Sequence, residues 1–253
     1  MTGRRLLVWR HGQTEWNASG RAQGQTEVPL DDAGRAQARE AAARLASLRP
    51  VALWSSDLSR ASETAQALAD VTGLRVRLDA RLREAHLGVR QGLTIAESRA
   101  QYPDEWARWD AGEQVRFPKA EVEHEVADRI RIVMRDAARE LLPEQLAVLV
   151  SHGVAMRLGI CRFLDLPQAN WKSFSGFSNC AWALLEEGQR GWRLMEYNAG
   201  SLPEPLLSDD LVDSDPDSAT QAPVDSPIDS GVDSYKSPST APVSQTRTPS
   251  SST

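Results

Sequence analysis

Near its N-terminus the chain carries the stretch Leu7-Val8-Trp9-Arg10-His11-Gly12-Gln13-Thr14-Glu15-Trp16-Asn17. The apolar run 6–9 has the length and bulk of a buried strand. It ends abruptly in Arg10, His11 and Gly12, and the carboxyl ends of strands are where open α/β sheets bind their ligands. An arginine beside a histidine is also common in ordinary polar loops. The rest of the chain therefore has to distinguish a site from a surface loop.

The composition indicates a soluble globular protein. The chain has 253 residues, of which 41% are hydrophobic and 25% charged, enough for one large domain or two small ones. It contains no run of about 18 apolar residues and no signal-peptide pattern, so we expect a cytoplasmic protein without a membrane partner. Cys161 and Cys180 lack metal-ligand spacing, and we expect both to fill the core.

The charge is unevenly distributed along the chain. Residues 208–253 contain eight Asp, one Lys and one Arg, whereas residues 1–207 contain 27 basic and 27 acidic residues. The sequence contains no basic face that would indicate a nucleic-acid partner. Ser, Asp, Pro and Thr dominate the C-terminal segment, which predicts a domain over 1–207 and a disordered acidic tail over 208–253. A phosphorylated or partner-binding tail remains an alternative.

Apolar runs alternate with amphipathic helical stretches through the remainder of the chain. Further strands are predicted at 51–54, 76–78 and 146–150, a hairpin at 180–185 and 192–197, and helices at 32–48, 59–73, 122–142 and 154–164. The stretch from 94 to 114 has a helical pattern that is interrupted by Pro103. This alternation predicts an α/β fold, a three-layer α/β/α sandwich with a mostly parallel sheet.

Polar side chains follow the other predicted parallel strands as well. Arg60 opens the helix after the second strand, Glu84 lies in the link after the third, and His152 follows the fourth. Because parallel strands end at one edge of a sheet, we expect these residues to share a pocket with Arg10 and His11. Arginines bind a phosphate monoester, an imidazole can attack phosphorus, and a carboxylic acid can protonate the departing oxygen.

Four motifs in this order resemble the histidine phosphatase (phosphoglycerate mutase-like) superfamily over about residues 4–200. They are Arg10 to Thr14 with Asn17, Ser55 with Arg60, Glu84 with Leu87-Gly88 and Gln91-Gly92, and Ser151-His152-Gly153. Within the superfamily, the segment 81–88 and Asn170-Trp171 look like the actinobacterial glucosyl-3-phosphoglycerate phosphatases. The resemblance implies a phosphoglycerate mutase-like fold.

The resemblance also implies a role for each matching residue. His11 would be the nucleophile that becomes a phosphohistidine, and Glu84 the general acid and later the base that activates water. The residues expected to bind the phosphoryl group or the substrate are Arg10, Asn17, Gln23, Arg60 and His152. No metal and no cofactor is implied, because arginines and imidazole supply the charge stabilisation.

Two places depart from the family pattern. Val89 and Arg90 stand where relatives usually carry an acidic or small residue followed by an aromatic one, and Ala120-Glu121-Val122 replaces a frequent Gly-Glu-Ser. Both places belong to the substrate-facing cap, so the identity of the leaving group stays open.

Several functions are therefore compatible with the sequence. The first is hydrolysis of a small phosphorylated metabolite, with glucosyl-3-phosphoglycerate as the leading candidate substrate. The alternatives are a phosphoglycerate mutase, which the short domain of about 200 residues disfavours, a broad-specificity phosphomonoesterase, and a degenerate binding or scaffold member. The hairpin over 180–197 could pair two subunits into a homodimer or complete the sheet alone.

Overall fold

The computed structural model describes residues 3–200 of the chain. Its strands are β1 (Arg5–Arg10), β2 (Ala52–Ser55), β3 (Val76–Leu78), β4 (Leu146–Ser151), β5 (Trp182–Gly188) and β6 (Gly191–Ala199). Its α-helices are α1 (Glu15–Ala18), α2 (Asp32–Ala46), α3 (Ser59–Thr72), α4 (Ile95–Gln101), α5 (Pro103–Asp110), α6 (Glu123–Arg139) and α7 (Gly153–Phe163). Three short 3₁₀ helices complete the described chain: η1 (Ala80–Leu82), η2 (Gly88–Arg90) and η3 (Gln168–Ser173). The predicted tail over 208–253 lies outside the described residues.

The strands form one mixed sheet in the order β3-β2-β4-β1-β5-β6. The first four strands in this order are parallel, whereas β5 pairs antiparallel with β1 and β6 antiparallel with β5. The prediction of a mostly parallel α/β sheet is confirmed. The C-terminal hairpin extends this sheet beyond β1, so β6 is one of its two edges.

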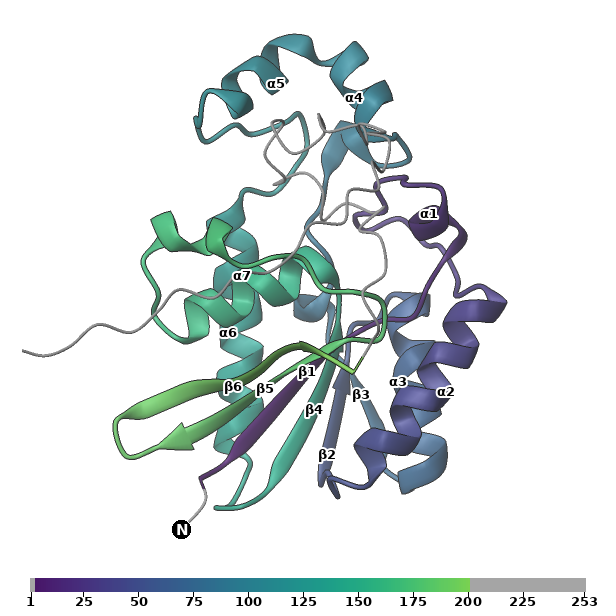
Figure 1. The fold of residues 1–253 in the computed structure, drawn as a ribbon, viewed down its shortest axis with the longest axis vertical. Helices are drawn as coiled ribbons and strands as arrows, with labels where there is room; N and C mark the ends of the chain where they lie inside the picture. Colours follow the sequence, from purple (N-terminus) through teal and green to yellow (C-terminus); the bar gives the residue numbers. More distant parts are fainter. Residues whose placement is uncertain (1–2, 201–253) are drawn as a thin grey trace, which may run out of the picture. The chain divides into compact units, whose positions relative to one another are not determined.

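Helices cover both faces of the sheet, which gives the three predicted layers (Figure 1). Alternate side chains of a strand point to opposite faces, and β1 follows this rule. Leu6 and Val8 pack in the hydrophobic cluster that contains α6 and α7, while Leu7 and Trp9 pack in the cluster that contains α2 and α3. All four of these side chains are fully buried. A strand covered on both faces in this way reads as an uninterrupted apolar run in the sequence.

The helix boundaries follow local signals in the sequence. The Asp31 side chain accepts a hydrogen bond from the Gly34 N–H at 2.7 Å and so caps α2. Gly73 ends α3 in the left-handed conformation, with φ of 73°. The predicted break at Pro103 separates α4 from α5. Trp106 of α5 is buried against Phe117, at a ring-centroid distance of 5.5 Å.

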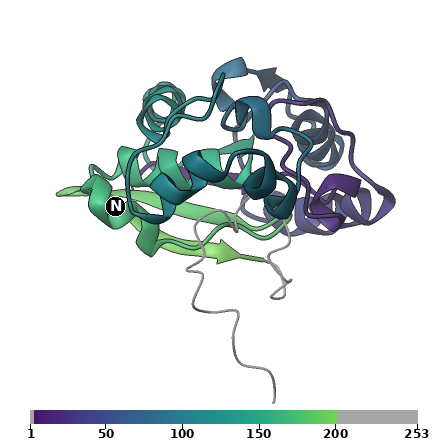
Figure 2. The same ribbon diagram turned by 90° about the horizontal axis from the view of Figure 1, so that it is seen from above.

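The helices α4 and α5 lie beyond the carboxyl ends of the parallel strands (Figure 1), and the view from above in Figure 2 looks down onto them. We call the segment 94–121, which contains both helices, the cap segment. It therefore lies on the side of the sheet where the polar strand-end residues gather. No helix within residues 3–200 combines the length and the apolar character that crossing a lipid bilayer requires.

Candidate active site

The register of β1 and β4 brings two histidines together. Arg10 lies opposite Ser151 in this parallel pair, and the His11 N–H donates to the Ser151 carbonyl oxygen at 3.1 Å. His11 and His152 each follow the last residue of their strand. Their ring centroids are 5.0 Å apart, with the ring planes at 59°. The two imidazoles consequently share one site although 140 residues separate them in the sequence.

His11 is held as a neutral imidazole with a defined tautomer. It is 2% exposed, and its Nδ1 lies 2.7 Å from the Gly12 carbonyl oxygen. A carbonyl oxygen can only accept, so Nδ1 carries the proton and Nε2 keeps its lone pair. Burial, followed by the charges of Arg60 and Arg10, holds the pKa of His11 well below the ordinary value of 6.5. An unprotonated Nε2 is the form that can act as a nucleophile.

His152 is oriented by Arg60 and Ser56. The Arg60 Nε–H donates to His152 Nδ1 at 3.2 Å, so the proton of the neutral ring lies on Nε2, which is 2.9 Å from Ser56 Oγ. Burial first, and then Arg60 and His11, hold the pKa of His152 well below 6.5. Arg60 is itself fully buried and also donates to the carbonyl oxygens of Thr26 at 2.8 Å and Gly24 at 2.7 Å.

The loops after β1 and before β5 complete this side of the site. Arg10 is 4% exposed and donates to the Phe177 carbonyl oxygen. The Asn17 side chain closes a capping box with Thr14 at the start of α1. The Asn179 amide donates to the His11 carbonyl oxygen at 3.2 Å and to Asn17 Oδ1 at 3.3 Å. The backbone that carries His11 is thereby fixed from two directions.

Glu84 lies at the N-terminus of α7, and this helix begins directly after His152. Its carboxylate accepts hydrogen bonds from the N–H groups of Ala85 at 2.7 Å, Ala155 at 2.8 Å and Val154 at 3.1 Å. The side chain is 5% exposed. Backbone N–H groups at a helix N-terminus are natural partners of a carboxylate, and here those of Val154 and Ala155 hold Glu84 at the first turn of the helix whose N-cap is His152.

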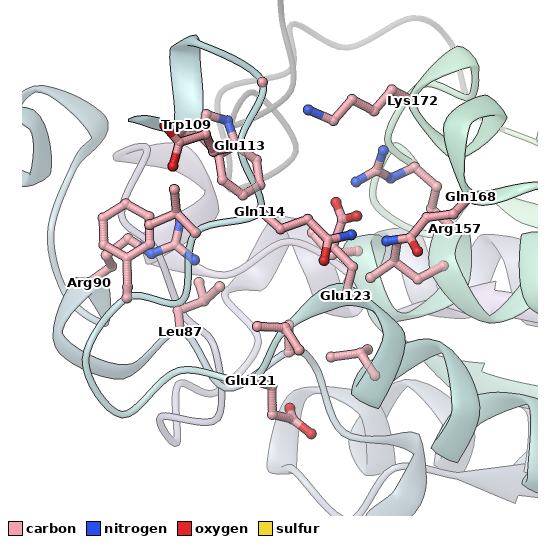
Figure 3. Close-up of a pocket in the computed structure, with 18 of the residues that line it drawn as sticks. Leu87, Arg90, Trp109, Glu113, Gln114, Glu121, Glu123, Arg157, Gln168 and Lys172 are labelled. Carbon is pink, nitrogen blue, oxygen red and sulfur yellow. The ribbon is translucent and has the colours of Figure 1, made fainter. Parts of the chain in front are cut away.

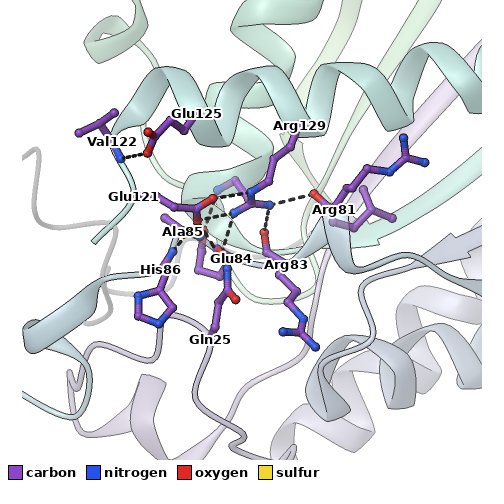
Figure 4. Close-up of polar contacts among 12 residues, drawn as sticks. Gln25, Arg81, Arg83, Glu84, Ala85, His86, Glu121, Val122, Glu125 and Arg129 are labelled. Atoms are coloured by element: carbon purple, nitrogen blue, oxygen red, sulfur yellow. Dashed lines mark hydrogen bonds and ion pairs between the residues drawn. The ribbon is translucent and has the colours of Figure 1, made fainter. Parts of the chain in front are cut away.

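Arg129 of α6 fixes the loop that carries Glu84 (Figure 4). Its guanidinium donates to the carbonyl oxygens of Arg81, Arg83 and Glu84, and it pairs with Glu121 through two bonds of 2.9 Å. Burial by itself would raise the pKa of Glu121, but the bonds from Arg129 and from the His86 N–H bring it below the ordinary value. Glu121, the one residue of Ala120-Glu121-Val122 that keeps the family pattern, therefore supports the loop of Glu84 through Arg129.

The structure brings all seven residues singled out from the sequence to this edge of the sheet. Gln23, in the loop between α1 and α2, is 3% exposed and precedes Gly24, whose carbonyl oxygen binds Arg60. Four supporting residues were not predicted from the sequence: Ser56, Asn179, Arg129 and Thr64, whose hydroxyl oxygen accepts a hydrogen bond from the Gly12 N–H at 3.1 Å. Ser56 had a signal, because it follows the end of a predicted strand; the other three depend on contacts distant in sequence. Within residues 3–200 no group of His, Cys, Asp and Glu is arranged to hold a metal ion.

The site and the fold agree with the known proteins that this chain matches. The model of the histidine phosphatase superfamily, branch 1, matches residues 6–200. A glucosyl-3-phosphoglycerate phosphatase of Mycobacterium tuberculosis is 38% identical over 219 residues, which cover 79% of this chain and 97% of the relative. A protein of Serratia proteamaculans named "probable phosphoglycerate mutase" is 35% identical over 74% of this chain and 86% of its own length.

A solved structure of similar fold supports the same assignment. The mycobacterial glucosyl-3-phosphoglycerate phosphatase in complex with VO3 superposes with a TM-score of 0.72 at 40% identity, over 78% of this chain and 100% of that chain. The present chain is therefore a phosphatase of the histidine phosphatase type and belongs to branch 1 of the histidine phosphatase superfamily.

Proposed function

We propose that the protein hydrolyses the phosphate monoester of glucosyl-3-phosphoglycerate through a phosphohistidine at His11. One observation supports this proposal above all others. The unprotonated Nε2 of His11 lies in a buried site with two guanidinium groups, a second imidazole and a carboxyl group. Guanidinium forks match phosphate oxygens, and a neutral imidazole is a nucleophile for phosphorus.

In the first step, Arg10, Arg60 and His152 bind the phosphoryl oxygens, and His11 Nε2 attacks the phosphorus. A nitrogen–phosphorus bond forms while the bond from phosphorus to the ester oxygen breaks. Glu84, in its protonated form, gives its proton to the departing oxygen, so the leaving group departs as an alcohol. The negative charge of a bound phosphate favours the protonated form of a carboxyl group beside it.

In the second step, water takes the position of the alcohol. The Glu84 carboxylate accepts a proton from the water molecule as its oxygen attacks phosphorus, and the nitrogen–phosphorus bond breaks. Inorganic phosphate leaves, and His11 returns to the neutral ring. In both steps the negative charge of the phosphoryl oxygens stays in contact with the two arginines. Hydrogen bonds to backbone carbonyl oxygens fix the positions of these arginines.

The choice of substrate rests on the relatives. The mycobacterial relatives that match 97% of their own length are named for glucosyl-3-phosphoglycerate. The 35% identity with the "probable phosphoglycerate mutase" of Serratia proteamaculans favours mutase activity as the second candidate, since that protein also aligns over most of its length. The length of the domain therefore does not separate the two activities.

The test is a phosphate-release assay without added metal on glucosyl-3-phosphoglycerate, 3-phosphoglycerate and an aryl phosphate. We expect the sugar ester to give the highest kcat/KM and His11→Ala to lose at least about 1,000-fold. His124→Ala, at an exposed position of α6, is the matched control. Full activity in His11→Ala would overturn the phosphohistidine mechanism, and interconversion of 3- and 2-phosphoglycerate as the main reaction would establish the mutase. Release of phosphate from none of these esters would overturn the proposed hydrolysis.

The covalent intermediate can be observed directly. Glu84→Gln can neither donate the proton nor activate water, so after mixing with an aryl phosphate, whose leaving group needs little protonation, we expect phosphate to remain on His11. Intact-mass measurement after alkaline quenching detects this phosphoryl group. Its absence in Glu84→Gln and in the wild type would contradict the covalent route.

The remaining expectations on partners and location are also proposals. We propose that the enzyme works in the cytoplasm on a small metabolite, without a nucleic-acid or membrane partner. For a homodimer, β6 offers the edge strand of the sheet that residues 3–200 form, and light scattering of the purified chain measures whether two copies pair.

A further inference from the structure

A cavity of about 380 Å³ lies next to Glu84, between the cap segment and the helices α6, α7 and η3. Ala85 and Val154, whose backbone N–H groups bind the Glu84 carboxylate, are both part of its wall. The general acid of a phosphatase must lie within hydrogen-bond distance of the departing oxygen, which carries the rest of the leaving group. The cavity therefore lies where the rest of the leaving group has to be, and we call it the leaving-group cavity.

The floor of the leaving-group cavity is apolar but contains a buried cation. Leu87, Phe117 and Leu158 contribute to the apolar surface. Arg157 of α7 also lines the cavity and is only 5% exposed, and Figure 3 shows its guanidinium directed into the space. Its Nη1 donates to the Trp171 carbonyl oxygen at 3.4 Å, and Glu113, Glu121 and Glu123 line the same cavity. A guanidinium carries five N–H donors, and the low dielectric of a buried site strengthens its pairing with a carboxylate.

The spacing along α7 matches a hydroxy acid. Val154 binds Glu84, and Arg157 follows it by three residues, a rise of about 4.5 Å on the same face of the helix. In a 3-phosphoglyceryl group the ester oxygen and the carboxylate are separated by three carbon atoms in a chain, counting the carboxyl carbon itself. A leaving oxygen beside Glu84 thus brings the carboxylate of the same glyceryl unit within reach of Arg157.

The rim of the cavity is suited to a sugar. The Gln114 and Gln168 amides are directed toward the cavity (Figure 3), and neither amide group has a hydrogen-bond partner within residues 3–200. Each amide can donate and accept, as hydroxyl groups require. The Trp109 ring offers a flat apolar surface on the cap side, with Lys172 Nζ 5.0 Å from its centroid.

We propose that the leaving-group cavity binds the glycosylated hydroxy-acid part of the substrate. Arg157 pairs with the carboxylate, and Trp109, Gln114 and Gln168 contact the sugar. This inference rests on the proposed function, because it names the part of the substrate that the acid Glu84 releases.

The test uses isothermal titration calorimetry with the dephosphorylated product glucosylglycerate and its neutral analogue glucosylglycerol, which lacks the carboxylate. We expect the wild type to bind glucosylglycerate at least about tenfold more tightly than glucosylglycerol, as for a charge-assisted hydrogen bond. Arg157→Met should bind the two glucosides with equal affinity, and Arg157→Lys should retain part of the preference for glucosylglycerate. An unchanged ratio in Arg157→Met would overturn the assignment of Arg157.

The sugar contacts have their own variants. Gln168→Leu should weaken the binding of both glucosides by about threefold to tenfold, the effect of one lost hydrogen bond. Gln189→Leu, the same change at an exposed turn residue between β5 and β6, should bind both as the wild type does. If Gln168→Leu and Trp109→Ala each bind the glucosides with wild-type affinity, the assignment of these two residues to the sugar is overturned.

A phosphate titration separates this inference from the proposed function. Inorganic phosphate should bind all these variants with the wild-type constant, which also shows that they are folded. A wild type that hydrolyses monoesters but binds glucosylglycerate no better than glycerate overturns the leaving-group cavity and leaves the phosphatase intact. If no monoester is hydrolysed, the proposed function fails, whereas preferential glucosylglycerate binding that depends on Arg157 still supports the cavity.

Discussion

At the scale of single residues, burial sets the charge of the two imidazoles. His11 and His152 are at most 2% exposed and lie among guanidinium groups, so each ring is neutral when the chain is folded. In the unfolded chain the same rings titrate near 6.5. The site therefore keeps a nucleophile ready at neutral pH, at the expense of stability in acid.

This difference gives a pH-dependent stability. Between 6.5 and the lower folded pKa, the unfolded chain binds protons at His11 and His152 that the folded chain does not bind. Their contribution to stability is therefore complete above 6.5 and is lost as the pH falls below it, by up to about 1.4 kcal/mol per pH unit for each histidine. Urea denaturation at pH 7.5, 6.5 and 5.5 measures the slope. His152→Gln should reduce it, and an identical slope in that variant would contradict the account.

Arg129 acts at the same scale through the position of Glu84. Arg129→Met removes the donors to the loop carbonyl oxygens of Arg81, Arg83 and Glu84 and leaves Glu121 without its cation. We expect kcat to fall by about 10- to 100-fold, since a displacement of about 1 Å at the acid has that effect. Arg44→Met, which breaks an exposed ion pair with Glu40, is the control and should stay within about twofold. Steady-state kinetics of both variants decide; equal kcat values would exclude the positioning role.

The sequence identified the reacting groups better than their supports. Arg10, His11 and His152 could be placed because each lies at the end of a recognisable strand. Asn179, which binds the His11 carbonyl oxygen, is 168 residues away from it, and no local pattern marks that contact. Hydrogen bonds of this kind arise only when the fold is complete, so spacing in the sequence does not reveal them.

At the scale of elements, α2 packs backbone against backbone on the loop that carries His11. A Cβ atom added to Gly34 would lie 2.0 Å from the Gln13 carbonyl oxygen, and one added to Gly12 would lie 2.4 Å from the Gly34 carbonyl oxygen. Two glycines therefore allow the helix to approach the loop closely. No side chain could occupy this contact without separating the two elements.

The variant Gly34→Ala tests this contact by the sign of its effect. Helix propensity alone predicts that alanine stabilises a helical position by up to about 1 kcal/mol relative to glycine. The clash with backbone predicts a net loss of about 1–3 kcal/mol instead. Ala36→Gly at an exposed position of α2 measures the propensity effect in the same helix. Chemical denaturation gives both values, and a stabilised Gly34→Ala would refute the close approach.

The cap segment shows which features of the elements could be predicted from the sequence and which could not. Its break at Pro103 was predictable, because proline cannot continue a helix. The leaving-group cavity was not, since its wall combines residues of the Glu84 loop, the cap segment, α6, α7 and η3. Of the residues that depart from the family pattern, Arg90 and Val122 line the cavity, and the Arg90 guanidinium carbon lies 4.2 Å from the centroid of the Phe117 ring. Glu121, which keeps the pattern, supports the loop of Glu84.

At the scale of the whole molecule, the buried runs predict a parallel sheet that is covered on both faces. The sequences of β1 and β4 are uninterrupted runs of apolar residues because helices cover both faces of these strands. This pattern was sufficient to predict a parallel sheet in three layers. The place of the C-terminal hairpin next to β1 was not predictable. Its alternating pattern is equally compatible with an edge shared between two subunits.

The last prediction concerns the boundary of the folding unit. The family match ends at residue 200, and both hydrophobic clusters around the sheet are formed by residues 6–199. We propose that residues 1–207 fold alone, so deletion of 208–253 should leave kcat/KM within about twofold and Tm within about 2 °C. Calorimetry and phosphate release of the two proteins measure this.

The deletion should nevertheless change solubility, because residues 1–207 carry equal numbers of acidic and basic residues and the removed segment holds the whole net charge of −6. A protein without net charge associates more readily at neutral pH and low ionic strength. We therefore expect the shorter chain to precipitate at a lower concentration in that buffer. A fall of Tm by about 5 °C or more, or an activity loss of about tenfold, would instead place part of the acidic segment within the functional fold.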